Sequence, residues 1–228
     1  MKILIIRPQP GNDASARRAI KAGFTPIQLP FFEVRARPWD APDPDRFDAL
    51  LVTSANAIRH AGAGLDAYRS LSVHAVGSNS AQAVREAGLV LATTGSGGIV
   101  EALENARVAG HVRLLWLAGE DQTKVEAPSG LSIEMRITYA AEPVEFGGEA
   151  RELVCMADIV ALHSTRAAQQ FSAFVDVESL DRGAIQLAAF SHGIADAAGK
   201  GWKGIAIAGR PEDRALLSAA QALVRVQS

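Results

Sequence analysis

Two serines stand at matching positions where an apolar run gives way to a helix-like stretch. Residues 47–58 read FDALLVTSANAI and residues 157–168 read ADIVALHSTRAA, which places Ser54 and Ser164 just after the apolar runs. Each segment is typical of a buried strand that leads into a helix. The first amides of a helix carry a partial positive charge and bind carboxylates or phosphates. A serine here also caps the helix with its hydroxyl, so the sequence leaves capping and anion binding open.

Two further turns, rich in glycine and serine, are also candidates for binding anions. Gly77, Ser78 and Ser80 follow the apolar residues 73–76, and residues 94–98 read TGSGG. Neither turn contains G-x-G-x-x-G or G-x-x-x-x-G-K-[ST], the patterns of nucleotide phosphate loops. We therefore expect anion-binding turns without nucleotide specificity, with plain tight turns as the alternative.

Two arginines and a tyrosine complete the candidate groups. Arg7 precedes Pro8 at the end of the first apolar run, and Arg166 comes two residues after Ser164. Either guanidinium can pair with a carboxylate ligand or form an ordinary surface salt bridge. Tyr139 is one of two tyrosines. Its phenol can line a polar site, or it can pack with its hydroxyl in water.

Several kinds of chemistry are disfavoured. The five histidines have no metal-ligand spacing, so we expect no metal site. A strand followed by the G-x-S-x-G nucleophile elbow is missing from the sequence. The formal net charge of −2 provides no basic field for nucleic acid or acidic membranes. Cys155 is the only cysteine, which excludes an intrachain disulfide, and its apolar neighbours predict a core thiol.

The composition is that of a globular protein. Of 228 residues, 48% are hydrophobic and 21% are charged, which is ordinary for such a chain. The N-terminal stretch is too short and too polar for a signal peptide, and the apolar runs are too short to span a membrane. We expect a cytoplasmic protein.

Strand and helix patterns alternate along the chain, which predicts an α/β fold with parallel sheets and helices on both faces. Asn12 or Asp13 is expected to cap the first helix, Pro and Asp make residues 38–46 irregular, and residues 120–130 are ambiguous. The expected strands are residues 2–6, 25–29, 48–53, 73–76, 89–92, 112–117, 158–162, 185–190 and 204–208. The expected helices include residues 54–63, 78–87, 98–106, 165–174 and 192–198, with a last helix from about residue 212.

The two halves of the chain resemble each other, because residues 76–95 align with residues 190–209 and place Gly95 on Gly209. We infer that one domain is inserted into another at the Pro-rich boundary. Two extended connections near residues 31–37 and 137–144 would link the domains and permit closure. The predicted domains are residues 1–36 with 144–228, and residues 38–137, with the active-site cleft between them.

The chain resembles the uroporphyrinogen-III synthase family over nearly its whole length. Each shared motif is short, but their order and duplicated arrangement are fairly specific. The motifs are IIRP at residues 5–8, TSANAI at 53–58, AVGSNSA at 75–81, LAG at 117–119, TYA at 138–140 and HSTRAAQQF at 163–171.

The resemblance implies two flavodoxin-like parallel-sheet domains joined by a two-stranded linker. It implies a lyase that acts on hydroxymethylbilane. The substrate loses its hydroxyl, the last pyrrole ring inverts through a spiro intermediate, and the macrocycle closes as uroporphyrinogen III. No cofactor or metal is implied. We expect a monomer, with transient contact to hydroxymethylbilane synthase and no nucleic-acid or membrane partner.

The family's functional positions map onto residues of this chain. Tyr139 would assist departure of the hydroxyl group. The substrate carboxylates would be held by Arg7, Pro8, Ser54, Ala55, Asn56, Gly77, Ser78, Ser80, Gly119, Ser164, Thr165, Arg166, Ser191 and His192.

The C-terminal motif departs from the family pattern. Ser191 stands where a glycine is expected, and Ile194 stands where a threonine is expected. The alternatives are therefore an inactive paralogue of the synthase or a non-catalytic two-domain ligand-binding protein. A two-domain glycosyltransferase would need larger domains than 228 residues provide.

Overall fold

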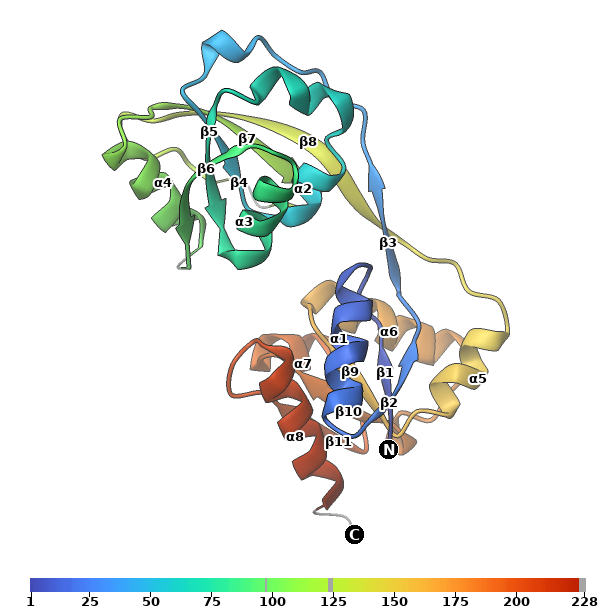
Figure 1. Cartoon of the computed structure of the whole chain (residues 1–228). Helices are drawn as coiled ribbons and strands as arrows, with labels where there is room; N and C mark the ends of the chain where they lie inside the picture. Colours follow the sequence, from blue (N-terminus) through green and yellow to red (C-terminus); the bar gives the residue numbers. More distant parts are fainter. Residues whose placement is uncertain (97, 123–124, 226–228) are drawn as a thin grey trace. The chain divides into compact units, whose positions relative to one another are not determined.

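The computed structural model describes residues 1–96, 98–122 and 125–225. The fold is mixed α/β with two largely parallel sheets, as the alternation of strand and helix patterns predicts (Figure 1). The chain divides into two compact units. Unit 1 combines Met1–Glu33 with the chain from Glu142 onward, and unit 2 is Val34–Ala141.

Unit 1 contains a five-stranded sheet in the order β11-β10-β9-β1-β2, with every neighbouring pair parallel. The inner strands β1, β9 and β10 are short, almost wholly buried runs, as parallel strands covered on both faces must be. The strands are β1 (Lys2–Ile5), β2 (Thr25–Gln28), β9 (Ile159–Leu162), β10 (Gln186–Ala189) and β11 (Gly204–Ile207). The helices are α1 (Gly11–Lys21), α5 (Glu149–Cys155), α6 (Thr165–Val177), α7 (His192–Ala198) and α8 (Asp213–Arg225), with a 3-10 turn η3 (Arg182–Ala184).

The unit 1 sheet separates two apolar layers. On one face, Ile3 and Ile5 of β1 pack with α1 and with Leu216 and Leu217 of α8. A group of aromatic rings forms a second cluster, in which Phe31 contacts Phe146, Phe171 and Phe174 at centroid distances of 4.7, 5.6 and 5.4 Å.

Unit 2 holds a six-stranded sheet in the order β3-β8-β7-β4-β5-β6. The strands β8, β7, β4, β5 and β6 are parallel to one another. The strands are β3 (Phe32–Ala36), β4 (Ala49–Val52), β5 (Ser72–Val76), β6 (Val90–Gly95), β7 (Arg113–Gly119) and β8 (Ser132–Pro143). The helices are α2 (Ala55–Arg59), α3 (Gly77–Glu86) and α4 (Ile99–Val108), with 3-10 turns η1 (Pro44–Arg46) and η2 (Gly62–Tyr68).

The strands β3 and β8 run in opposite directions. Arg37 N–H donates to Thr138 C=O at 2.8 Å, and Val144 N–H donates to Phe31 C=O at 3.1 Å. As the residue number rises from Phe31 to Arg37, the residue number of the hydrogen-bonding partner falls from Val144 to Thr138, which is the antiparallel pattern. The boundaries of the two units lie inside these two strands.

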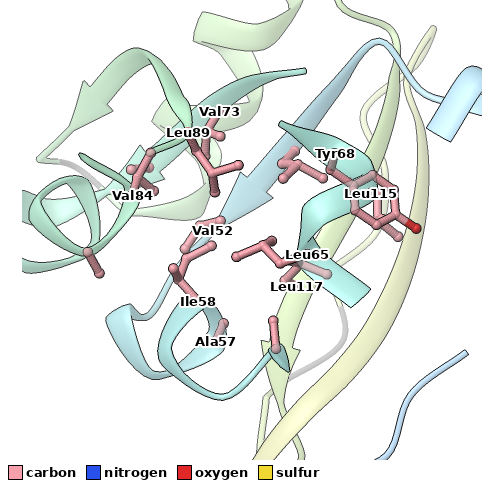
Figure 2. Close-up of a cluster of buried hydrophobic side chains, with 14 of the residues drawn as sticks. Val52, Ala57, Ile58, Leu65, Tyr68, Val73, Val84, Leu89, Leu115 and Leu117 are labelled. Atoms are coloured by element: carbon pink, nitrogen blue, oxygen red, sulfur yellow. The ribbon is translucent and has the colours of Figure 1, made fainter. Parts of the chain in front are cut away.

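Successive residues of β4 supply both apolar cores of unit 2, because side chains alternate across a sheet. Leu50 and Val52 belong to the cluster with α2, α3 and η2, part of which Figure 2 shows. Ala49 and Leu51 belong to the opposite cluster, with Trp116 and α4. In the first cluster Tyr68 is fully buried, and its hydroxyl donates to the carbonyl of Pro42.

Several helix boundaries differ from those predicted. The helix α1 begins at Gly11, so neither Asn12 nor Asp13 caps it. Asn12 is instead buried inside the first turn, and its amide donates back to the carbonyls of Ile5 and Arg7 at 2.7 and 2.9 Å. The predicted helix 54–63 ends at Arg59. After it, Gly62 takes a left-handed backbone (φ 63°) and a 3-10 turn follows.

Two other predictions are corrected. Cys155 is exposed at the end of α5, where its neighbour Val154 faces the core, so it is not a core thiol. The Pro-rich segment is not wholly irregular, because Asp43 caps the 3-10 turn η1 by accepting from Asp45 N–H. The two units divide between Ala141 and Glu142, within the range of residues 139–148 expected for the second boundary, and β8 runs across this division to Pro143. The described part of residues 120–130 contains turns, and Thr123 and Lys124 lie outside it.

A histidine pair lies beneath α4 in unit 2, although the two residues are far apart in sequence. His74 is fully buried in β5, and its Nε2 lies 2.9 Å from Nδ1 of His111. Its Nδ1 lies 2.8 Å from Oγ1 of Thr93. Burial, together with the neighbouring His111, lowers the pKa of His74 from 6.5 to about 4.

We expect unit 2 to lose stability as pH falls from 6.5 to about 4. The unfolded chain binds a proton on His74 in this range and the folded chain does not, so acid favours unfolding. The wild-type free energy of unfolding should fall by about 3 kcal/mol on this account. Chemical denaturation at several pH values measures it. His74→Gln should flatten the slope, and His192→Gln, at an exposed histidine, should leave it unchanged. Equal slopes in all three proteins would contradict the prediction.

Candidate functional site

The predicted site residues of unit 1 lie at the carboxyl edge of its sheet. Arg7 and Pro8 follow β1, Ser164 follows β9 and Ser191 follows β10. Because these strands are parallel and adjacent, their carboxyl ends meet at one edge. Residues separated by up to about 180 positions in sequence are thereby brought together.

The serines of this edge cap helices. Ser164 Oγ accepts from Ala167 N–H at 3.2 Å, and Ser191 Oγ accepts from Ile194 N–H at 3.4 Å. Thr165 begins α6 and is exposed. The guanidinium of Arg166 lies over the ring of Phe32, 4.5 Å from its centroid. His192 is exposed as the first residue of α7.

A buried charge cluster lies beside this edge and was not predicted from the sequence. Asp213, at the start of α8, accepts from Ser15 Oγ at 2.9 Å and from Arg18 Nη1 at 2.7 Å, and its Oδ1 lies 3.1 Å from His163 Nε2. Burial alone would raise the pKa of Asp213, but hydrogen bonds from His163 and Ser15 and the charge of Arg7 lower it to about 2. Burial lowers the pKa of His163, so the imidazole is neutral at neutral pH.

The second group of predicted residues lies at the carboxyl edge of the unit 2 sheet. Ser54 follows β4 and caps α2, with its Oγ accepting from Asn56 N–H at 3.2 Å. Ala55 is buried next to it. Gly77 follows β5 and takes a left-handed backbone (φ 78°), which favours glycine at the start of α3. On that helix Ser78 is exposed, and Ser80 is buried within unit 2.

Tyr139 lies on β8 against the end of β7. A side chain on Gly119 would place its Cβ 2.5 Å from Tyr139 Cζ and 2.7 Å from the phenol oxygen. The ring is half-buried, and its centroid lies 6.3 Å from that of His60. Glu120 N–H donates to the Tyr139 carbonyl at 2.9 Å, which fixes the backbone there. The phenol is therefore held over a glycine at the same edge as Ser54 and Gly77.

The turn at residues 94–98 includes Gly97, which lies outside the described residues. In the described part of the turn, Ser96 N–H donates to Oε2 of Glu101 at 2.8 Å. A carboxylate of the chain itself thus accepts from one amide of the turn that we expect either to bind an anion or to be a plain tight turn. Within the described ranges, no three His, Cys, Asp or Glu side chains gather as metal ligands would.

Comparison with known proteins identifies the family. A sequence profile described as uroporphyrinogen-III synthase HemD matches residues 13–218. The chain belongs to the uroporphyrinogen-III synthase family. The resemblance based on the short motifs is therefore confirmed. A comparison with curated protein sequences returns no match.

Solved structures of this family have the same fold. A uroporphyrinogen-III synthetase from Helicobacter pylori aligns with a TM-score of 0.66 at 14% identity, over 97% of this chain and 99% of that one. A mutant uroporphyrinogen III synthase from the extremely thermophilic bacterium Thermus thermophilus aligns with a TM-score of 0.51 at 17% identity, over 99% of this chain and 98% of that one. None of the described helices is both long and apolar enough to cross a membrane.

We expect Gly119→Ala to destabilise unit 2, because the added methyl group meets the Tyr139 ring well inside van der Waals distance. Overpacking of this kind costs about 1–3 kcal/mol. Thermal or chemical denaturation measures the loss. Gly209→Ala is the matched control, since a Cβ there meets no atom within 4 Å. Tyr139→Ala should remove the penalty, and an equal penalty with and without the tyrosine ring would contradict the contact.

Proposed function

We propose that this chain is an active uroporphyrinogen-III synthase, a lyase that converts hydroxymethylbilane to uroporphyrinogen III. The observation that carries the proposal is the family match over residues 13–218. The carboxyl edges of both sheets support it, because each presents helix starts suited to carboxylates.

The reaction needs positioning more than strong acid–base groups. A pyrrole nitrogen of the substrate helps to expel the terminal hydroxyl group, which leaves with a proton as water. The substituted carbon of the last ring then attacks the electrophilic carbon and forms the spiro intermediate. The bond from that ring carbon to the neighbouring bridge carbon breaks, the bridge carbon bonds to the unsubstituted α-carbon of the same ring, and that α-carbon loses its proton as the macrocycle closes. Holding the reacting carbons together can supply most of the rate enhancement. We propose that Tyr139 donates a hydrogen bond or the proton to the departing hydroxyl.

The substrate carries eight carboxylates, and we propose that both units hold some of them. In unit 1 the ligands are Arg7 and the starts of α6 and α7, and in unit 2 they are the starts of α2 and α3. We propose that the units are two flavodoxin-like domains linked by β3 and β8. The order β2-β1-β9-β10-β11 in unit 1 supports this description, because flavodoxins have the order 2-1-3-4-5. The cleft and the monomeric state stay predictions.

The direct test is to supply hydroxymethylbilane and separate the uroporphyrinogen isomers. An active synthase gives isomer III. Accumulation of isomer I alone, the spontaneous product, would contradict the proposal and favour an inactive paralogue or a ligand-binding protein. The drifted residues Ser191 and Ile194 are the reason for keeping these alternatives.

We expect Tyr139→Phe to lower the rate of isomer III formation about tenfold without abolishing it, which is a modest loss for one proton donor. Single-turnover kinetics measures this rate. Tyr68→Phe is the control, because the hydroxyl of this second tyrosine is buried against Pro42 C=O and should affect stability only. A wild-type rate for Tyr139→Phe would remove the Tyr139 hydroxyl from the mechanism.

A further inference from the structure

The side chain of Arg7 folds back from the sheet edge onto the start of α1. Its Nη1 donates to Ser15 Oγ at 3.2 Å and lies 3.8 Å from Asp213 Oδ1. Ser15 is buried and donates to Asp213 Oδ2 at 2.9 Å, so the serine links the guanidinium to the carboxylate. The Arg7 side chain keeps 31% of its surface exposed. The side chain is therefore held through Nη1 and stays partly exposed to solvent.

Gly11 leaves the space that this arrangement needs. A Cβ on Gly11 would lie 2.5 Å from Arg7 Nε, 2.8 Å from Cζ and 2.9 Å from Nη2. Gly11 is the first residue of α1 and has a helical backbone, so its conformation does not require glycine. The close approach of the Arg7 guanidinium does require it. Any larger residue would displace the end of a flexible side chain.

The charge balance leaves the cluster positive. Asp213 is shared by the guanidinium groups of Arg7 and Arg18, and the imidazole of His163 beside it is neutral at neutral pH. Two positive charges thus face one negative charge. A single carboxylate from a ligand would balance the cluster. Arg18 on α1 is the more exposed of the two arginines, but Arg7 is the partly exposed one that follows a strand at the carboxyl edge.

We propose that Gly11, Ser15 and Asp213 form a seat that positions the Arg7 guanidinium to bind one carboxylate of the substrate. The identity of the ligand rests on the proposed function. The three seat residues act through Arg7, so they are positioning residues. Gly11 and Ser15 belong to α1 and Asp213 to α8, which gives the C-terminal helix a role in substrate binding.

The sharpest test is Gly11→Ala. Alanine is the better helix former, so the melting temperature should stay equal or rise. The displaced guanidinium should raise KM about tenfold, the effect of losing one charge-assisted hydrogen bond, while kcat stays within about twofold. Gly147→Ala is the matched control, since a Cβ there meets nothing within 4 Å. An unchanged KM, or the same rise in KM when Gly11→Ala is added to Arg7→Ala, would overturn the proposal.

A second pair of variants separates positioning from charge. Ser15→Ala removes the hydrogen bond to Arg7 without changing any charge, and we expect KM to rise. If Asp213 merely neutralised Arg7, Ser15→Ala would leave KM unchanged and Asp213→Asn would lower it. That result would also contradict the proposal that Gly11, Ser15 and Asp213 position Arg7.

A measurement independent of turnover uses citrate as a small carboxylate probe. We expect citrate to shift the Arg7 Nε–H resonance of the wild-type protein saturably, with about fivefold weaker binding in Gly11→Ala. The absence of an Arg7 shift in the wild-type protein would overturn the proposal. If the wild-type protein binds citrate through Arg7 but forms no isomer III, the proposed function is contradicted, while the proposal that Gly11, Ser15 and Asp213 position Arg7 is still supported.

Discussion

The architecture of both units follows from the parallel pairing of their strands. Every pairing in the unit 1 sheet is parallel, as are the pairings among β8, β7, β4, β5 and β6 in unit 2. Each strand must therefore be followed by a connection that crosses back over the sheet, here usually a helix. The carboxyl ends of the strands and the starts of these helices gather at one edge of each sheet. This geometry brings Arg7, Ser164 and Ser191 together, although most of the chain separates them.

Features that depend on neighbouring residues could be predicted from the sequence. The helix caps at Ser54 and Ser164 are local patterns, and the structure has both. Features that join distant residues could not be predicted from the sequence. Asp213 meets Ser15 across 198 positions because α8 and α1 pack on the same face of the unit 1 sheet. His74 meets His111 across 37 positions because α4, which His111 follows, packs on β5. No local pattern distinguishes these residues from ordinary polar ones.

The predicted and unpredicted residues have complementary roles in this account. The hydroxyls of Ser54 and Ser164 already accept hydrogen bonds from helix amides. The proposed carboxylate contacts at these helix starts would therefore come from the neighbouring amides. Gly119 and Gly11 act by leaving space, the first for the phenol of Tyr139 and the second for the guanidinium of Arg7. A reaction that depends on positioning suits such a site, in which the residues mainly fix where charged and polar groups lie.

We propose that the carboxyl edges of both sheets bind the same substrate. Amide NMR of the labelled protein, titrated with uroporphyrin III as a stable octacarboxylate related to the product, tests this proposal. We expect amides at the starts of α2, α3, α6 and α7 to shift together with a single dissociation constant. Shifts confined to one unit, or two unrelated dissociation constants for the two units, would contradict it.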